Sequence, residues 1–362
     1  MKLFFDARYI ETSLHNGISR YSTEMARALA PLHEDTTFII CDDKQKELLP
    51  PAAKAIRIHK PTSPKEPFTA FVLNKYHPDV VFSPMQTMGS LGRRFGLILT
   101  LHDLIYYHYR IPPHQFNWFI RLGWRLYHAT YIPQRLTLNH ADSIATVSNT
   151  SKQEIEAVRL TKRPIIVTYN APQNLSALLD EPFAPNKTPK NLIYMGSFME
   201  YKNVETLIKG MAQLPGYTLH LLSRIQPHRK QQLEALAPKG SSIIFHNGVS
   251  DETYAQLLAN QALTVTASLD EGYGIPVADS LALGVPAVIS NIPIFHEVAA
   301  DGAYYFDPRD PQSFAKTVLA ASELAVYQDL SQKGKVHSQS FTWTHSAEVL
   351  LSEIQQLYAK RQ

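Results

Sequence analysis

The chain contains two successive series in which short apolar runs alternate with segments of helical period. The runs of the first series are KLFFDA, TTFIICD, PDVVFSP, GLILTLHD, SIATVS and RPIIVTYNAP. Between them, SRYSTEMARALAPL and the residues around 117–139 have the apolar spacing that is typical of helices. This alternation predicts a parallel sheet covered by helices on both faces, with ligands bound beyond the carboxyl ends of the strands.

The second series begins at NLIYMGS and ends with the helical pattern PQSFAKTVLAASEL. Because 362 residues exceed the length at which one hydrophobic core stops growing, we expect two domains. The sequence therefore predicts an α/β protein of two doubly wound, Rossmann-like domains that face each other across a cleft. We place these domains at 1–172 and 191–344, with a proline-rich linker at 173–190. The amphipathic closing helix, at about 345–362, is expected to pack back on the first domain.

The composition is that of an ordinary soluble globular protein, with 44% hydrophobic and 19% charged residues. A net charge of +3 is too small to indicate nucleic-acid binding, although it permits an anionic ligand or membrane surface. The single cysteine, Cys41, cannot form an internal disulfide and is expected to be a buried strand residue in a reducing compartment. The hydropathy pattern predicts neither a signal peptide nor a membrane span, so we expect a cytoplasmic protein.

A glycine-rich turn lies between two carboxylates in DEGYGIPVADSLALGVPAVIS, residues 270–290. Pro276 suits the first position of a helix, where its missing N–H costs nothing, and Gly284 suits the end. A short helix is therefore predicted at about 276–283. In this helix Asp279 lies on the same face as the helix start.

The chemistry of this stretch suits a ligand that carries both phosphate and hydroxyl groups. Glu271 approaches the helix start from the loop, so Glu271 and Asp279 could border one small site. Free backbone N–H groups and the positive end of the helix dipole attract phosphate, whereas carboxylates accept hydrogen bonds from hydroxyls. A nucleotide sugar has both groups. The alternative is structural: the dipole stabilises a first-turn Asp279 by about 0.3–1 kcal/mol, and glycine followed by proline is ordinary loop chemistry.

Two loops of the first series lie where predicted strands end and contain candidate site residues. In HNGISRY, Gly17 opens a helix whose N-terminal amides could meet phosphate, although an ordinary capped helix is the favoured interpretation. In TLHDL, His102 follows an apolar strand. A lone histidine is more often structural, yet the carboxyl end of a strand in an α/β fold is a good position for catalysis.

Two loops of the second series provide further candidates. In YMGSFMEYKNVETLI, a strand ends at Gly196 and Ser197, Lys202 could bring a positive charge to the site, and Asn203 is a plausible helix N-cap. A solvated lysine beside a cap is the structural alternative. In HNGVSDE, the backbone at Val249 could border a base.

The order of these motifs resembles the family-four retaining glycosyltransferases of the GT-B fold. The segments that carry the resemblance run from about residue 3 to about 350 and include GISRY, LHD, ADSIATVSNTSKQEI, YMGS with KNVETLIKG, NGVSDE, ASLDEGYGIPVADSLALGVPAVISNIPIFHEV and FTW. The most specific element is a pair of acidic residues separated by seven others, here Glu271 and Asp279.

The resemblance implies a role for each matching position. Glu271 would hold hydroxyls of the donor sugar, and Asp279 those of the ribose. Lys202 would neutralise the diphosphate, and His102 would lie beside the sugar near the acceptor. The remaining donor-binding positions are Gly17, Gly196, Ser197, Val249, Gly272, Tyr273, Gly274 and Ile275.

Two positions depart from the family pattern. The second acidic residue is usually glutamate, and Asp279 is shorter by one methylene group. The lysine often has an arginine partner, but Ser197 and Tyr201 stand at the nearby positions. Arg224, which follows LHLLS, is a candidate replacement.

The implied reaction is metal-independent transfer of a hexose from a nucleotide diphosphate sugar to a hydroxyl, with retention of the anomeric centre and no cofactor. FFDARYI with GISRY, and YKNVETLI, look like mannosyltransferase members of the family, so GDP-mannose is favoured over UDP-glucose as donor. A UDP-glucose donor, a phosphorylase-like or epimerase activity, and a non-catalytic nucleotide-sugar-binding protein are the alternatives.

The acceptor is expected to be a glycan or a lipid-linked molecule. Residues 114–135, HQFNWFIRLGWRLYHATYIPQR, interleave arginines with aromatic residues, which suits an anionic membrane surface. Weak peripheral association with the inner face of the membrane is therefore our hypothesis, and a packed helix with an arginine-lined face is the alternative.

Overall fold

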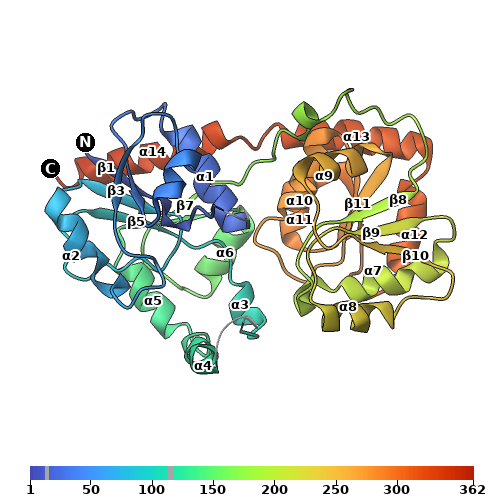
Figure 1. Ribbon diagram of the computed structural model, residues 1–362, viewed down its shortest axis with the longest axis horizontal. Coiled ribbons are helices and arrows are strands. Elements are labelled where there is room, and N and C mark those ends of the chain that lie inside the picture. Colours follow the sequence, from blue (N-terminus) through green and yellow to red (C-terminus); the bar gives the residue numbers. More distant parts are fainter. Residues whose placement is uncertain (13–15, 113–117) are drawn as a thin grey trace. The chain divides into compact units, whose positions relative to one another are not determined.

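The chain folds into two compact units in the computed structural model, which describes residues 1–12, 16–112 and 118–362 (Figure 1). The first unit comprises Met1–Asn170 and Thr342–Gln362, and the second comprises Ala171–Phe341. The closing helix, α14 (Trp343–Ala359), thus belongs to the first unit.

The predicted linker at 173–190 is part of the second unit rather than a separate connection. Its apolar residues explain this difference. The 3₁₀ helix η5 (Leu175–Leu178) contributes Leu175 to a buried cluster of the second unit, and Phe183 packs against the same cluster. A segment rich in proline can therefore still be anchored, because its few large apolar side chains are removed from water.

The first unit contains a parallel sheet of seven strands in the order β3-β2-β1-β4-β5-β6-β7. These strands are β1 (Leu3–Asp6), β2 (Thr37–Ile40), β3 (Lys54–Arg57), β4 (Val80–Ser83), β5 (Gly96–Thr100), β6 (Ser143–Thr146) and β7 (Ile165–Val167). Its other helices are α1 (Gly17–Leu29), α2 (Thr69–Leu73), α3 (Ile105–His108), α4 (Trp118–Tyr127), α5 (Ile132–Asn139) and α6 (Asn149–Ala157). The strand order reverses between β1 and β4.

The second unit repeats this plan with a parallel sheet of six strands in the order β10-β9-β8-β11-β12-β13. The strands are β8 (Asn191–Tyr194), β9 (Thr218–Leu221), β10 (Ser242–Phe245), β11 (Ala262–Thr266), β12 (Ala287–Ser290) and β13 (Ala303–Phe306). The helices are α7 (Val204–Gly210), α8 (Pro227–Glu234), α9 (Asp251–Ala259), α10 (Ile275–Leu283), α11 (Pro293–Ala299), α12 (Pro311–Ala321) and α13 (Leu324–Ser338).

The predicted fold class of two doubly wound α/β domains is confirmed. In the second unit the strand order is the Rossmann order, and it reverses between β8 and β11. In sheets of this type ligands bind at the carboxyl ends of the strands that flank the reversal. A ligand site of the second unit is therefore expected at the loops after β8 and β11.

Some elements have no clear pattern in the sequence. β3 is an edge strand with exposed Lys54 and Arg57, so it lacks an apolar run. The helical stretch around 117–139 is divided into α4 and α5. Cys41 is half-buried and follows β2, so the prediction of a buried strand residue is wrong.

Candidate functional site

Lys202 and Glu271 form an ion pair at the strand-order reversal of the second unit. Lys202 lies in the loop after β8 and Glu271 in the loop after β11, and the Lys202 Nζ to Glu271 Oε1 distance is 2.5 Å. The side chains are only 15% and 12% exposed. The two loops are also joined by the main chain, because the Leu269 N–H donates to the Tyr201 carbonyl at 2.7 Å.

The two carboxylate oxygens of Glu271 have different surroundings. Oε1 accepts from Lys202 and also from the Ser268 hydroxyl at 2.8 Å. Ser268 is buried, and its oxygen lies 3.0 Å from the Thr266 hydroxyl at the end of β11. Within the described part of the chain, Oε2 has no hydrogen-bond partner. The loop thus holds the carboxylate by one oxygen and leaves the other available to a donor from a ligand.

Asn203 holds the loop that carries Lys202, although it does not cap α7 as predicted. It adopts a left-handed conformation with φ 49°, and its side-chain amide donates to the carbonyls of Ala267 and Pro308. The helix therefore begins without a side-chain acceptor from Asn203 for its N-terminal amides. What Asn203 provides is a link between the loops after β8 and β11.

The turn before α10 requires glycine at Gly274. Its φ is 95°, and an added Cβ would lie 2.7 Å from the Phe295 ring. Gly272 and Tyr273 are buried beside it. α10 begins at Ile275, where an N–H has no intrahelical acceptor. This N-terminus therefore meets the loop of Glu271 at the same edge of the sheet.

Asp279 is only 2% exposed and is bound by the segment that starts the second unit. Its Oδ1 accepts from the Gln173 backbone N–H at 2.9 Å, and its Oδ2 accepts from the Gln173 side-chain amide at 3.2 Å. Because α10 begins one residue earlier than predicted, Asp279 lies beyond the first turn. The first-turn dipole explanation for this residue is therefore wrong. The predicted ribose contact would have to share Asp279 with Gln173.

The remaining candidates of the second unit lie in the loops after β8 and β10. The Gly196 N–H donates to the Ser223 hydroxyl at 3.1 Å, and the exposed Ser197 offers its carbonyl to the Tyr194 hydroxyl at 2.6 Å. Val249 is partly buried and packs against a hydrophobic cluster. These contacts explain the conformation of the loops. The donor-binding roles of Gly196, Ser197 and Val249 remain predictions.

Arg224 lies over the loop that contains Val249. An added Cβ on Gly248 would be 3.1 Å from the Arg224 Cγ. Arg224 is exposed and forms no ion pair with any described residue. Arg229, in contrast, is engaged with Glu205 and with the Phe198 carbonyl. Arg224 is thus the arginine of this region that is available to an anion.

Gly17 and His102 belong to the first unit, whereas the other predicted site residues belong to the second. Gly17 is exposed at the start of α1, whose N-cap is Asn16. From the same helix, the Tyr21 ring meets the His102 ring edge-on at 5.0 Å. His15, in the predicted HNGISRY loop, lies outside the described residues.

The protonation of His102 follows from its environment. Its Nε2 lies 2.9 Å from the Pro84 carbonyl, which can only accept, so Nε2 carries the hydrogen. Burial lowers the pKa of His102 below its ordinary value, against the opposing effect of this hydrogen bond. The ring is therefore neutral at pH 7, and Nδ1 is an acceptor without a partner among the described residues.

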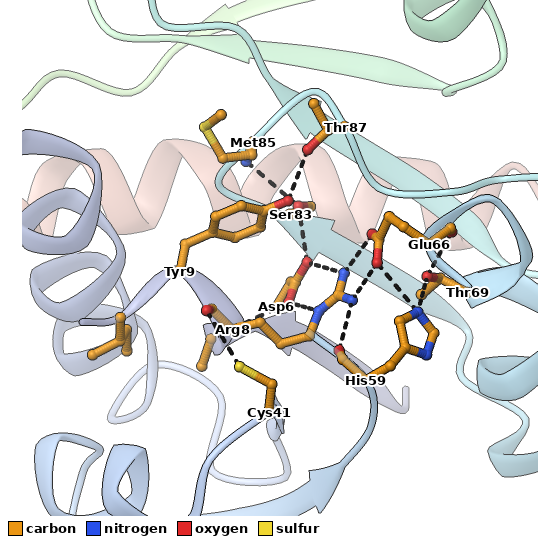
Figure 2. A network of polar contacts seen from close by, with 12 residues as sticks. Asp6, Arg8, Tyr9, Cys41, His59, Glu66, Thr69, Ser83, Met85 and Thr87 are labelled. Atoms are coloured by element: carbon orange, nitrogen blue, oxygen red, sulfur yellow. Dashed lines mark hydrogen bonds and ion pairs between the residues drawn. The ribbon is translucent and has the colours of Figure 1, made fainter. Parts of the chain in front are cut away.

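A buried charged cluster at the strand-order reversal of the first unit was not predicted. Figure 2 shows the Arg8 guanidinium between the carboxylates of Asp6 and Glu66. Both pairs are bidentate, with distances of 2.7 and 2.9 Å to Asp6 and 2.6 and 2.8 Å to Glu66. Burial lowers the pKa of Arg8, but the two carboxylates outweigh it and hold the pKa above its ordinary value. The motif FFDARYI thus contains the charges that anchor the loop after β1.

The part of the chain that the structure describes contains no group of three or more His, Cys, Asp or Glu side chains gathered to hold an ion. Asp42 caps the 3₁₀ helix η2 (Asp43–Leu48), and Asp43 pairs with Lys46 and Arg57. The adjacent aspartates therefore have a local structural explanation.

The two Rossmann-like units and the charged loops of the second sheet define a class of two-domain α/β proteins with a ligand site at the strand ends. Two family models match the chain: Glycosyltransferase Family 4 over residues 15–171 and Glycosyl transferases group 1 over residues 177–337. Together they cover most of both units. The chain belongs to the family-four glycosyltransferases of the GT-B fold.

Curated relatives are similar over parts of their length. The serotype-specific mannosyltransferase WbdA of Escherichia coli is 34% identical over 106 residues, which cover 29% of this chain and 13% of WbdA. The O-antigen chain mannosyltransferase RfbU of Salmonella typhimurium is 26% identical over 195 residues, which cover 52% of this chain and 54% of RfbU. The alignments therefore span about half of RfbU and much less of WbdA.

Solved structures match over nearly the whole chain. Sucrose-phosphate synthase of Thermosynechococcus elongatus superposes with a TM-score of 0.75 at 16% identity and covers 99% of both chains. HepE of Anabaena, solved in complex with UDP and glucose, has a TM-score of 0.70 at 16% identity and covers 98% of this chain and 99% of its own. At this identity, the similarity establishes the fold.

Proposed function

We propose that the protein is a glycosyltransferase that moves a hexose, with mannose favoured, from a nucleotide diphosphate sugar to a hydroxyl of a glycan or lipid-linked acceptor. The observation that carries the proposal is the Lys202–Glu271 pair at the strand-order reversal of the second unit. Next to it in the chain lies the N-terminus of α10. A cation and a helix N-terminus suit the diphosphate, and a carboxylate suits the sugar.

Binding of the donor would use charges that the loops already hold. In the structure Lys202 is neutralised by Glu271, so an arriving diphosphate would compete for the ammonium group. Glu271 would keep its hydrogen bond from Ser268 and offer Oε2 to a sugar hydroxyl. Arg224 provides a further charge in the second unit for the phosphates or the base.

The proposed reaction breaks the bond between the anomeric carbon and the diphosphate oxygen and forms a bond to the acceptor oxygen. Fixed charges that face the developing negative charge contribute about 2.7–4 kcal/mol each in such sites. The resemblance to retaining members of the family supports retention, with a phosphate oxygen of the leaving group taking the acceptor's proton. The neutral His102, with Nδ1 as an acceptor, suits a hydroxyl contact near the sugar.

Replacement of Glu271 by alanine is expected to lower kcat about 10- to 100-fold, because a charge-assisted hydrogen bond contributes about 1.5–3 kcal/mol. The contact should strengthen as the sugar ring flattens, so KM for the donor should change much less. Steady-state kinetics with radiolabelled donor measures both constants. Glu200→Ala, an exposed carboxylate in the preceding loop, is the control. An unchanged kcat in Glu271→Ala would contradict the catalytic role and leave Glu271 with a structural role only.

GDP-mannose is expected to stabilise the protein more than UDP-glucose. The support is the FFDARYI, GISRY and YKNVETLI pattern, together with relatives that include mannosyltransferases of O-antigen synthesis. A donor at about 100 times its dissociation constant adds roughly 2.7 kcal/mol to the free energy of unfolding. Thermal shift across nucleotide sugars measures the effect. A rise in Tm with UDP-glucose and none with GDP-mannose would favour the alternative donor, as in the HepE complexes with UDP and glucose.

A non-catalytic nucleotide-sugar-binding protein is the second candidate, because the Lys202–Glu271 pair and the N-terminus of α10 suit binding of such a ligand whether or not a reaction follows. Incubation with labelled donor separates the two proposals. Transfer of sugar to an acceptor, or slow hydrolysis of the donor, supports the transferase. Binding without turnover supports the binding protein.

A further inference from the structure

An exposed apolar face on α4 and α5 has no covering element in the described part of the first unit. In α4 no residue is buried, and Phe119 and Leu126 are 67% and 66% exposed. In α5, Leu136 is 62% exposed. The full set of large apolar residues exposed on these helices is Trp118, Phe119, Ile120, Leu122, Leu126, Ile132 and Leu136. We call this set the α4–α5 face.

The orientation of α4 is fixed by contacts on its opposite side. The Trp124 ring stacks on His128 at 4.1 Å and meets Tyr106 edge-on at 5.3 Å. Phe119, Leu122 and Leu126 have the spacing of one helical face, and that face lies away from Trp124. In Figure 1, α4 lies at the periphery of its unit, beyond α3 and α5 from the sheet. The helix therefore packs through Trp124 and presents the face with Phe119, Leu122 and Leu126 to solvent.

The charge around this face has one sign. No aspartate or glutamate occurs from residue 104 to residue 141, whereas Arg110, Arg121, Arg125 and Arg135 do. Arg121 and Arg125 belong to α4 and form no ion pair with any described residue. Arg135 is held by the carbonyls of Val158 and Arg159. The face thus combines apolar side chains with unpaired positive charge.

We propose that the α4–α5 face binds the surface of an anionic lipid bilayer, with Phe119, Leu122 and Leu126 in the headgroup–acyl boundary and Arg121 and Arg125 among the phosphates. Amphipathic helices with this arrangement lie in the plane of the interface. No described helix is long and apolar enough to cross a membrane. A second copy is a poorer occupant, because symmetric docking would bring the same arginines against each other. The inference concerns binding and does not depend on the proposed reaction.

Vesicle sedimentation of the full chain tests the proposal. At low salt the protein is expected to bind vesicles of phosphatidylcholine mixed with phosphatidylglycerol, and to bind vesicles of phosphatidylcholine alone much more weakly. Phe119→Ser combined with Leu126→Ser should weaken binding at least about tenfold, because both side chains lose their apolar contact with lipid. Arg121→Gln and Arg125→Gln should each weaken binding roughly fivefold.

The matched control is Phe68→Ser combined with Phe71→Ser. These two residues are 53% and 49% exposed elsewhere on the same unit, so their loss removes similar apolar surface. Binding of this control should equal that of the unaltered protein. The proposal is overturned if the unaltered protein stays in the supernatant with anionic vesicles, or if the control loses as much binding as the α4 variant. It is also overturned if the α4 variant only abolishes a concentration-dependent dimer and leaves vesicle binding unchanged.

Discussion

Replacing Lys202 with alanine is expected to lower kcat by about 10²–10³-fold, the loss that follows when one fixed group is removed from the position where charge develops. In the proposed reaction the diphosphate leaving group gains negative charge as its bond to the sugar breaks. Lys202 is the cation that the ion pair with Glu271 holds at the strand-order reversal. The N-terminus of α10 adds only about half a positive charge. Lys202 is therefore expected to supply most of the neutralisation.

The same reasoning predicts that EDTA has little effect on turnover, because in the proposed mechanism the protein's own charges would take the place of a divalent ion. Lys202→Arg should restore activity only in part, since the planar guanidinium is bulkier and directs its hydrogen bonds differently. Lys209→Ala, an exposed lysine of α7, is the matched control and should have normal kcat. Activity that is lost in EDTA and restored by Mg²⁺, together with normal turnover in Lys202→Ala, would overturn the assignment.

The second large effect concerns the stability of the first unit. Arg8→Met is expected to lower its free energy of unfolding by about 3–5 kcal/mol, because the carboxylates of Asp6 and Glu66 stay buried and lose the guanidinium that neutralises them. Glu66 belongs to η3 (Glu66–Phe68), so the same substitution should release that segment from the loop after β1. Hydrogen exchange at the amides of β1 and β4 in the full chain reports on this unit separately from the second.

Arg27→Met is the control for this prediction. Arg27 also pairs with a glutamate, Glu24, but on the exposed surface of α1. Exposed pairs contribute about 0–1 kcal/mol, so the exchange rates of β1 should hardly change. Combining Arg8→Met with Asp6→Asn and Glu66→Gln should recover part of the lost stability, because neutral amides tolerate burial better. Equal effects of Arg8→Met and Arg27→Met would show that the buried cluster has no special importance.

Local patterns in the sequence were sufficient to predict the two-domain α/β architecture. The alternation of β-rich runs and helical periods predicted two doubly wound parallel sheets, since each element is decided largely by its own residues and their spacing. Pro276 and Gly284 marked α10 to within one residue, because proline and glycine act through backbone conformation at their own positions. β3 was missed, since an edge strand with polar ends has no apolar run.

The contacts within each site were decided by tertiary structure. Glu271 and Lys202 were separate candidates in the sequence, and only the adjacency of β8 and β11 joins them in one ion pair. The binding of Asp279 by Gln173 depends on how the segment at the start of the second unit packs against α10. Neither contact has a local signal, because the partners are 69 and 106 residues apart in the chain.

The Arg8 cluster separates what the sequence determines from what only the tertiary structure decides. The sequence alone predicted that KLFFDA forms a strand, because its apolar residues make a short β-rich run. It did not reveal that Arg8 would be buried, since an isolated arginine is normally exposed. Burial becomes tolerable only when Asp6 and Glu66 lie on either side of the guanidinium. The fold supplies that compensation by bringing residue 66 to the end of β1, and no pattern of neighbouring residues encodes it.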